Sequence, residues 1–168
     1  MGFDKNKYLA EMREMVSMSI EKWNTLSSAK VIYAISIWTD IAARFSSLNI
    51  ETKQNSDICV ASINAFFKLN HEQDVADGDL EMAELFNKTF TRNTNPADFH
   101  FRNFSTIRHR SIGKYFHSKS KAWTLIHPLL ITIQSEVKLS FARFPHEADA
   151  EIAINSDKEW YDFPIQID

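Results

Sequence analysis

The apolar residues in the first part of the chain recur at steps of three and four positions. Between residues 8 and 26 this spacing is continuous, which is typical of an amphipathic helix with one buried face. The pattern stutters at Ser28, a residue suited to cap a new helix. Residues 31–45 then resume the same steps. Their β-branched beginning would also suit a strand, but the continuation in helical phase favours a second, largely buried helix.

The same reasoning predicts four further helices, at 58–69, 80–92, 96–117 and about 120–143. Asp79 is suited to cap the helix at 80–92, and acids in the first turn of that helix favour its dipole. Asn95 as an N-cap, with Pro96 at the first helical position, marks the start of the helix at 96–117. We expect Pro128 to kink the last helix and Pro145 to end it.

The end of the chain has a different period. In residues 150–167 apolar and polar positions alternate, which indicates extended chain or a hairpin. A lone hairpin is marginal in water, so this segment must pack on the helical part or on a partner subunit. We therefore predict an all-α fold, a bundle of five to six helices. Its domains are a helical domain at 1–145 and an extended C-terminal arm or short hairpin at 146–168.

Composition narrows the class of protein. The chain has only 3 glycines and 4 prolines, which favours long helices over many tight turns. The single cysteine, Cys59, excludes an internal disulfide and any multi-cysteine zinc site, and we expect neither a metal nor a cofactor. The first residues have no apolar leader segment, and the apolar run at 31–38 is too short to span a bilayer. A cytoplasmic protein without membrane contact is expected.

Charge is segregated along the chain although the net charge is only −3. Residues 72–84 hold six acids and no Lys or Arg, whereas residues 88–121 hold eight Lys or Arg and one acid. The basic segment suggests a surface for RNA or an acidic protein, with four candidate residues: Arg108, Arg110, Lys114 and His117. The alternative is that these blocks neutralise one another once the chain is folded.

One candidate catalytic pair lies on the helix predicted at 96–117. Arg102 and His109 are seven residues apart, which places them about 20° apart on a helical wheel. An imidazole can take the 2′-hydroxyl proton of RNA or protonate the leaving oxygen, and a guanidinium can hold the phosphate. The pair therefore suits metal-free RNA cleavage. The alternative is a solvated or interfacial flank whose side-chain stems cover core aromatics.

The sequence Arg102-Asn103, followed after five more residues by His109, resembles the signature of the HEPN superfamily of small all-helical nucleases. The resemblance covers these eight residues. It implies a homodimer whose two motif helices meet across a cleft. It also implies that Arg102 and His109 are catalytic, that Asn103 orients them, and that RNA is the substrate, often in toxin or anti-phage settings.

Three functions are compatible with these features. The first is a small binding or interaction protein that works as a homodimer, because the helix at 31–45 has a broad apolar surface and the C-terminal arm needs a support. The second is a metal-independent ribonuclease built on Arg102 and His109, the one case in which the protein is an enzyme. The third is a helical bundle that encloses a small apolar ligand among its phenylalanines.

Overall fold

The computed structural model describes residues 2–26, 30–113 and 119–168. Its fold is mixed α/β, so the predicted all-α bundle is wrong. Along the chain the elements are α1 (Lys5–Thr25), β1 (Ile32–Asp40), β2 (Phe45–Thr52), α2 (Lys53–Asp77), α3 (Leu80–Phe86), a 3-10 turn (Pro96–Asp98), β3 (Phe101–Arg108), α4 (Lys119–Phe141), β4 (His146–Ile154) and β5 (Asp162–Gln166).

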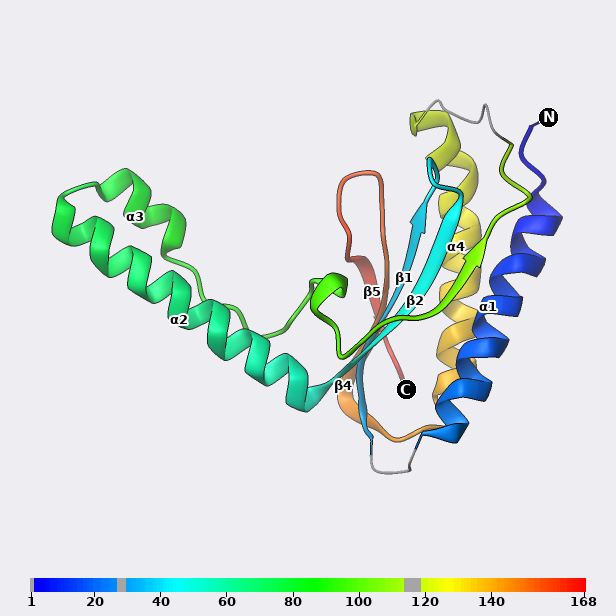
Figure 1. Ribbon diagram of the computed structural model, residues 1–168, viewed down its shortest axis with the longest axis horizontal. Helices are drawn as coiled ribbons and strands as arrows, with labels where there is room; N and C mark the ends of the chain where they lie inside the picture. The colour runs from blue at the N-terminus through cyan, green and yellow to red at the C-terminus, as the bar shows by residue number, and fades with distance from the viewer. Residues whose placement is uncertain (1, 27–29, 114–118) are drawn as a thin grey trace.

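The five strands form one sheet in the order β3-β2-β1-β4-β5. Strands β1 and β4 are parallel, and the other neighbours are antiparallel. Helices α1 and α4 both cover the same face of the sheet, and the other face is not covered by a helix (Figure 1). The core lies between the helices and the sheet, where α1 contributes Tyr8, Met12 and Met15 and β1 contributes Ile35 and Ile37. We call the face without a helix the open face, although the central strand β1 is largely buried there too, with only Trp38 and Asp40 partly exposed.

The helix predicted at 31–45 is instead the hairpin of β1 and β2. Ile35 and Ile37 point into the core, while Trp38 lies on the open face. The run lacks clear alternation because most of β1 is buried on both faces. The turn that joins the strands is held by Asp40, whose carboxylate accepts a hydrogen bond from the Ala43 backbone N–H at 2.8 Å. Strand pairing thus outweighs the accidental helical spacing.

The prediction of a helix at 96–117 is also wrong, because residues 101–108 of this segment form the strand β3, although a helical turn does begin at Pro96. Asn95 does cap a turn, with the Ala97 N–H donating to its side-chain oxygen at 3.2 Å, but only the 3-10 turn follows before β3. Asn103 has a left-handed φ of 50°, which interrupts the alternation of the strand. Phe101 and Phe104 consequently both contact Trp23 of α1. This irregularity produces the three-residue spacing that is typical of a helix.

Helices α2 and α3 form an arm that projects away from the sheet (Figure 1). They confirm the helices predicted at 58–69 and 80–92, although α3 ends at Phe86. Asp79 caps α3, accepting from the Met82 N–H at 3.1 Å, and Gly78 takes the left-handed turn between the helices with a φ of 78°. Edge-on ring contacts join the two sides of the arm, through Phe66, Phe67, Phe86 and Phe90.

The remaining helices agree with the sequence pattern, but the C-terminal segment is not a separate arm. Helix α1 and helix α4 are present, and Pro128 lies inside α4. The break expected at Ser28 lies outside the described residues. The alternating tail does form the paired strands β4 and β5, yet β4 also pairs with β1 inside the sheet. Residues 146–168 therefore pack on residues 1–145 as two strands of the same sheet. None of the helices in the described ranges is long and apolar enough to cross a bilayer.

Candidate functional site: a tryptophan groove at the end of β1

The structure places the predicted catalytic residues on two sides of the sheet. Arg102 is exposed on the open side, where its guanidinium donates to the Ala97 carbonyl oxygen at 3.4 Å. Asn103 is on the same strand, and its backbone N–H donates to the Asn49 side chain at 2.8 Å. His109 follows the strand and is only 3% exposed, packed beneath α1. The geometry does not bring the guanidinium and the imidazole to one phosphate.

The predicted anion-binding residues are partly outside the described ranges. Arg108 ends β3 and is exposed, paired across the sheet with Phe45. Arg110 is also exposed, although its backbone N–H donates to Glu11 at 2.9 Å. Lys114 and His117 lie outside the described residues. Two of the four predicted residues therefore present charge on the surface.

A buried polar network surrounds His109. The Glu11 carboxylate, on α1, accepts from His109 Nδ1 at 3.0 Å and from the Ser111 hydroxyl at 2.6 Å. His109 Nε2 is 2.7 Å from Ser46 Oγ, which in turn lies 2.6 Å from Thr39 Oγ1. The Glu–His–Ser connectivity is that of a hydrolase triad. Ser46, however, is fully buried and already bonded to Thr39, so a substrate cannot reach it.

Burial and hydrogen bonding set the protonation of this network. Burial lowers the pKa of His109 below 6.5, and its hydrogen bond to Glu11 only partly opposes the shift. For Glu11, burial alone would raise the pKa, but hydrogen bonds from Ser111, His109 and the Arg110 backbone hold it below 4.5. At neutral pH a carboxylate thus faces a neutral imidazole. The network ties α1 to the sheet. The sequence contained a signal for this network, because the acid Glu11 falls on the apolar face of its helix beside Tyr8.

We expect acid to destabilise the protein partly through His109. As pH falls below about 6.5, the unfolded chain binds a proton that the folded imidazole does not, so the free energy of unfolding decreases. Glu11 adds a further loss only when pH falls below about 4.5. Urea unfolding at pH 7.5 and 5.5 measures the difference. In His109→Gln this difference should be smaller than in the wild type, and an equal difference in both proteins would contradict the assignment.

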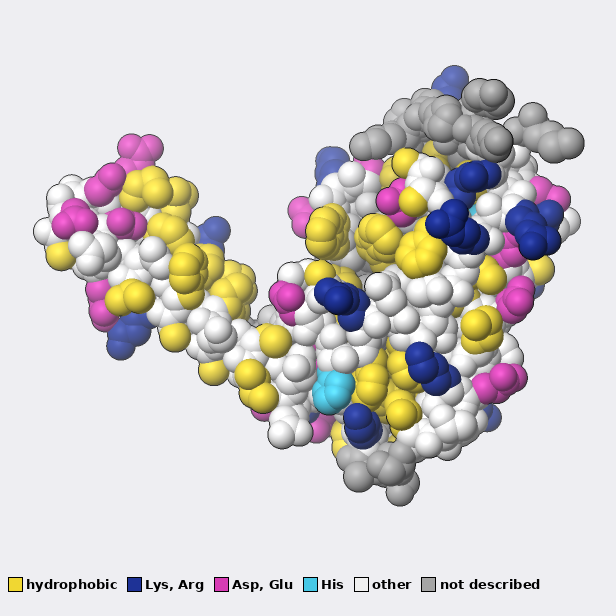
Figure 2. Space-filling view, in the orientation of Figure 1, with side chains coloured by type: hydrophobic (Ala, Val, Ile, Leu, Met, Phe, Trp, Pro, Cys, Tyr) yellow, Lys and Arg dark blue, Asp and Glu magenta, His cyan; other side chains and the backbone are white. Residues whose placement is uncertain are grey.

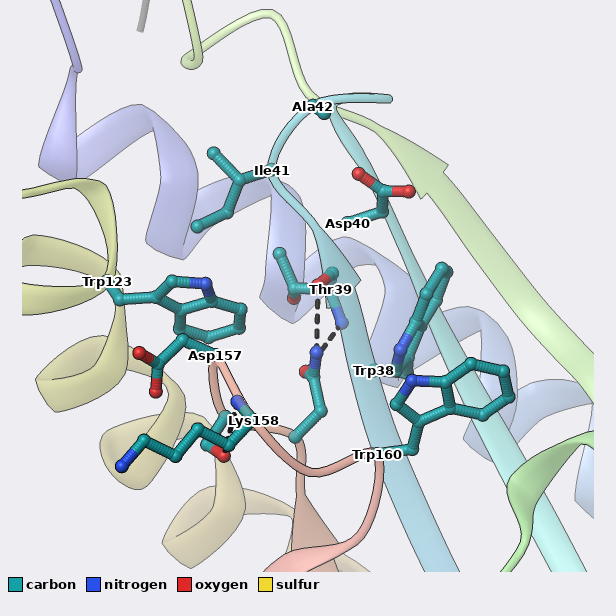
Figure 3. A pocket seen from close by; sticks show the side chains of 11 residues that line it. Trp38, Thr39, Asp40, Ile41, Ala42, Trp123, Asp157, Lys158 and Trp160 are labelled. Atoms are coloured by element: carbon teal, nitrogen blue, oxygen red, sulfur yellow. Dashed lines mark hydrogen bonds between the residues drawn. The ribbon is translucent and has the colours of Figure 1, made fainter. Parts of the chain in front are cut away.

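A groove lined by tryptophans lies at the end of β1, where the strand passes into its hairpin turn. Trp38 comes from β1, Trp123 from α4, and Trp160 from the loop between β4 and β5. One hollow of about 330 Å³ contains all three indoles, and an adjoining hollow of about 210 Å³ contains Trp38 and Trp160 together with Arg102. Figure 3 shows Trp123 on one side of the larger hollow and Trp38 and Trp160 on the other. We call these two hollows together the tryptophan groove.

Some polar groups of the larger hollow are hydrogen-bonded within the chain, whereas others are available to a ligand. Asn155 forms the floor of the larger hollow and is already engaged, accepting from the Thr39 N–H at 2.8 Å and donating to the Thr39 carbonyl at 2.9 Å. Asp40 and Asp157 line the same hollow, and within the described ranges neither carboxylate has an ion-pair partner. Trp160 is 62% exposed. An exposed indole beside unpaired carboxylates is typical of a binding surface.

Sequence reasoning did not find this groove, because its three tryptophans are spread over more than 120 residues of chain. Trp38 falls within the helix predicted at 31–45, and no spacing in the sequence relates it to Trp123 or Trp160. No group of three or more His, Cys, Asp or Glu in the described part of the chain is arranged to hold a metal ion. Comparison of the chain with family models, with curated proteins and with solved structures gave no match.

Proposed function

We propose that this chain is a homodimeric interaction protein that associates through the arm formed by α2 and α3. One observation carries the proposal: eight large apolar side chains of the arm are between 38% and 69% exposed. They are Ile58, Ile63, Phe66, Leu69, Val75, Leu80, Met82 and Leu85. Figure 2 shows hydrophobic side chains along much of the arm.

An apolar surface of this kind requires a partner. Within α2 the structure gives only one buried residue, Ser56, at the base of the helix next to the body. Two helices joined by a few ring contacts and side-chain hydrogen bonds do not enclose a core of their own. A contiguous exposed apolar patch marks an interface. Burial of the arm against another surface would remove this apolar area from water.

Charge favours a second copy of the chain as that partner. The end of the arm carries the six acids of residues 72–84, whereas Lys and Arg are spread over the visible face of the body (Figure 2). Two arms packed side by side in the same direction would bring their acidic ends together. Two arms packed antiparallel about a two-fold axis would instead keep the acidic ends apart and direct each toward the partner's body, whose visible face carries Lys and Arg (Figure 2). The antiparallel pair is the arrangement that satisfies both the apolar and the charged surface.

The test replaces Phe66 and Leu69, both more than half exposed, by serine. We expect light scattering to give twice 19.5 kDa for the wild type and one chain mass for the double variant at the same concentration. Loss of these apolar contacts from both copies should raise the dissociation constant by at least about a hundredfold. Circular dichroism would verify that the helices remain.

Leu139→Ser provides the matched control. Leu139 is 79% exposed on α4 of the body, outside the proposed interface, so its variant should retain the mass of two chains. A wild-type mass of one chain at micromolar concentration would refute the proposal, and so would an unchanged dimer in the Phe66→Ser, Leu69→Ser variant.

The structure gives no support to the two other functions considered from the sequence. The ribonuclease requires Arg102 and His109 side by side on a helix, whereas they lie on a strand edge and beneath α1. The bundle around a small apolar ligand required an all-α fold, which is contradicted by the five-stranded sheet. Partner binding is thus the function that the geometry favours.

A further inference from the structure

We propose that the tryptophan groove binds an arginine side chain presented by an extended segment of a partner polypeptide. This inference deepens the proposed function, on which it rests, by naming the chemistry of the partner that the homodimer binds. The groove is formed within one chain and does not include the arm.

The shape of the larger hollow suits a flat cation. Trp123 stands on one side of the larger hollow and Trp38 and Trp160 on the other, with Thr39 between them, so a planar group can stack on the indoles of either side (Figure 3). The aliphatic stem of Lys158 crosses the lower edge of the hollow, and its ammonium group points away from Trp38 and Trp160 (Figure 3). A guanidinium stacks on aromatic rings through its plane, which a compact ammonium cannot do.

The charge of the hollow also suits arginine. Asp40 and Asp157 contribute two carboxylates against the single ammonium of Lys158. The Asp40 carboxylate accepts one backbone hydrogen bond, from Ala43, and neither carboxylate has an ion-pair partner within the described ranges. Carboxylates accept paired hydrogen bonds from a guanidinium, so an incoming arginine would satisfy groups that the chain leaves available.

The same features disfavour two other ligands of aromatic grooves. A phosphate or a nucleic acid backbone would meet the carboxylates of Asp40 and Asp157 and be repelled. A sugar stacks on indoles but also needs amides and hydroxyls for its own hydroxyl groups. The amide of Asn155 is bound at both ends to the Thr39 backbone and offers little to a sugar.

The second hollow argues for a polypeptide and not a free cation. It continues beyond Trp38 and Trp160 and is lined by Pro96, Ala97, the amide of Asn49 and the guanidinium of Arg102, so it suits a neutral or acidic neighbour of the arginine. A single guanidinium occupies only part of the first hollow, whereas an extended segment can place its arginine there and an adjacent residue in the second. Extended peptides in aromatic grooves commonly place alternate side chains in successive pockets.

The four tryptophans make the protein its own reporter. We would record indole N–H signals by nuclear magnetic resonance while adding the peptide acetyl-Leu-Ala-Arg-Ala-Leu-amide. The signals of Trp38, Trp123 and Trp160 are expected to shift, while that of Trp23, which is 5% exposed in the helical layer, should not. Single Trp→Phe variants assign the signals. A peptide with citrulline, a neutral isostere, in place of arginine should bind at least about tenfold more weakly.

Asp40→Asn and Asp157→Asn should each weaken binding of the arginine peptide by about threefold to tenfold. Asn at position 40 keeps the acceptor for the Ala43 N–H, so the turn is preserved. Glu14→Gln, a change of an exposed acid on α1, is the control and should bind as the wild type does. The Asp variants should keep the mass of two chains, and the arm variant should keep the indole shifts. Failure of the groove and failure of the dimer are therefore distinguishable.

Several results would overturn the inference. These are unmoved groove indoles at millimolar peptide, equal binding of the citrulline peptide, and stronger shifts with a hexathymidine oligonucleotide or with maltohexaose. Equal affinity for N-acetylargininamide alone would overturn the assignment to a polypeptide, because the second hollow would then add nothing to binding.

Discussion

Replacement of Glu11 by alanine is expected to lower the free energy of unfolding by about 3 kcal/mol, because buried donors lose their acceptor. The carboxylate accepts from the His109 ring, from the Ser111 hydroxyl and from the Arg110 backbone, and its residue is 9% exposed. Alanine leaves each of these groups without a partner beneath α1. Urea unfolding at pH 7.5 measures the loss.

Glu14→Ala is the control for this prediction. Glu14 lies on the same helix, one turn further along, and is exposed, so its removal should change the free energy of unfolding by less than about 0.5 kcal/mol. A Glu11→Ala protein as stable as the Glu14→Ala protein would mean that the network contributes nothing.

Glu51→Ala is also expected to lower the free energy of unfolding by about 3 kcal/mol, but through contacts at the base of the arm. Glu51 is fully buried where β2 passes into the arm, and its carboxylate accepts from the Asn55 amide at 3.0 Å, the Asn93 amide at 2.8 Å and the His100 backbone N–H at 3.1 Å. Asn55 belongs to the outgoing helix of the arm, and the other two donors belong to the returning chain. One side chain therefore fixes both ends of the arm to the sheet.

Hydrogen–deuterium exchange would locate the effect. In Glu51→Ala the amides at the start of α2 and in residues 93–100 should exchange faster, while those of α1 and α4 should change less. Glu21→Ala, on the exposed side of α1, should leave both regions unchanged. A uniform increase over the whole chain would show that Glu51 supports global stability without a special role at the base of the arm.

The candidate sites differ in how far the sequence could have located them. Glu11 was detectable, because an acid on the apolar face of a helix needs a buried partner. Its partner His109 stood out in the sequence only as a candidate catalytic residue, on a helix predicted at 96–117, where the structure has the strand β3 and the chain after it. The tryptophan groove had no local signal, since it forms only when β1, α4 and the loop before β5 are brought together. Contacts between distant segments leave no period in a single sequence.

Local pattern determined the elements whose stability is local. The amphipathic spacing of α1 and α4, the Asp79 cap of α3 and the alternation in the last strands were all readable from the sequence. Helices depend on neighbours three and four residues away, and those neighbours are visible in the chain itself. The exposed apolar face of the arm was likewise present in the sequence, although only the structure shows that no other element covers it.

Tertiary structure alone decided the sheet. Residues 31–45 and 101–108 carry helical spacing by accident, in one case because β1 is buried on both faces and in the other because left-handed Asn103 breaks the alternation of β3. Each becomes a strand because it pairs with a strand from elsewhere in the chain, and those backbone hydrogen bonds depend on partners that local spacing does not specify. The same pairing carries Arg102 and His109 to different sides of the sheet and brings the tryptophans together at the end of β1.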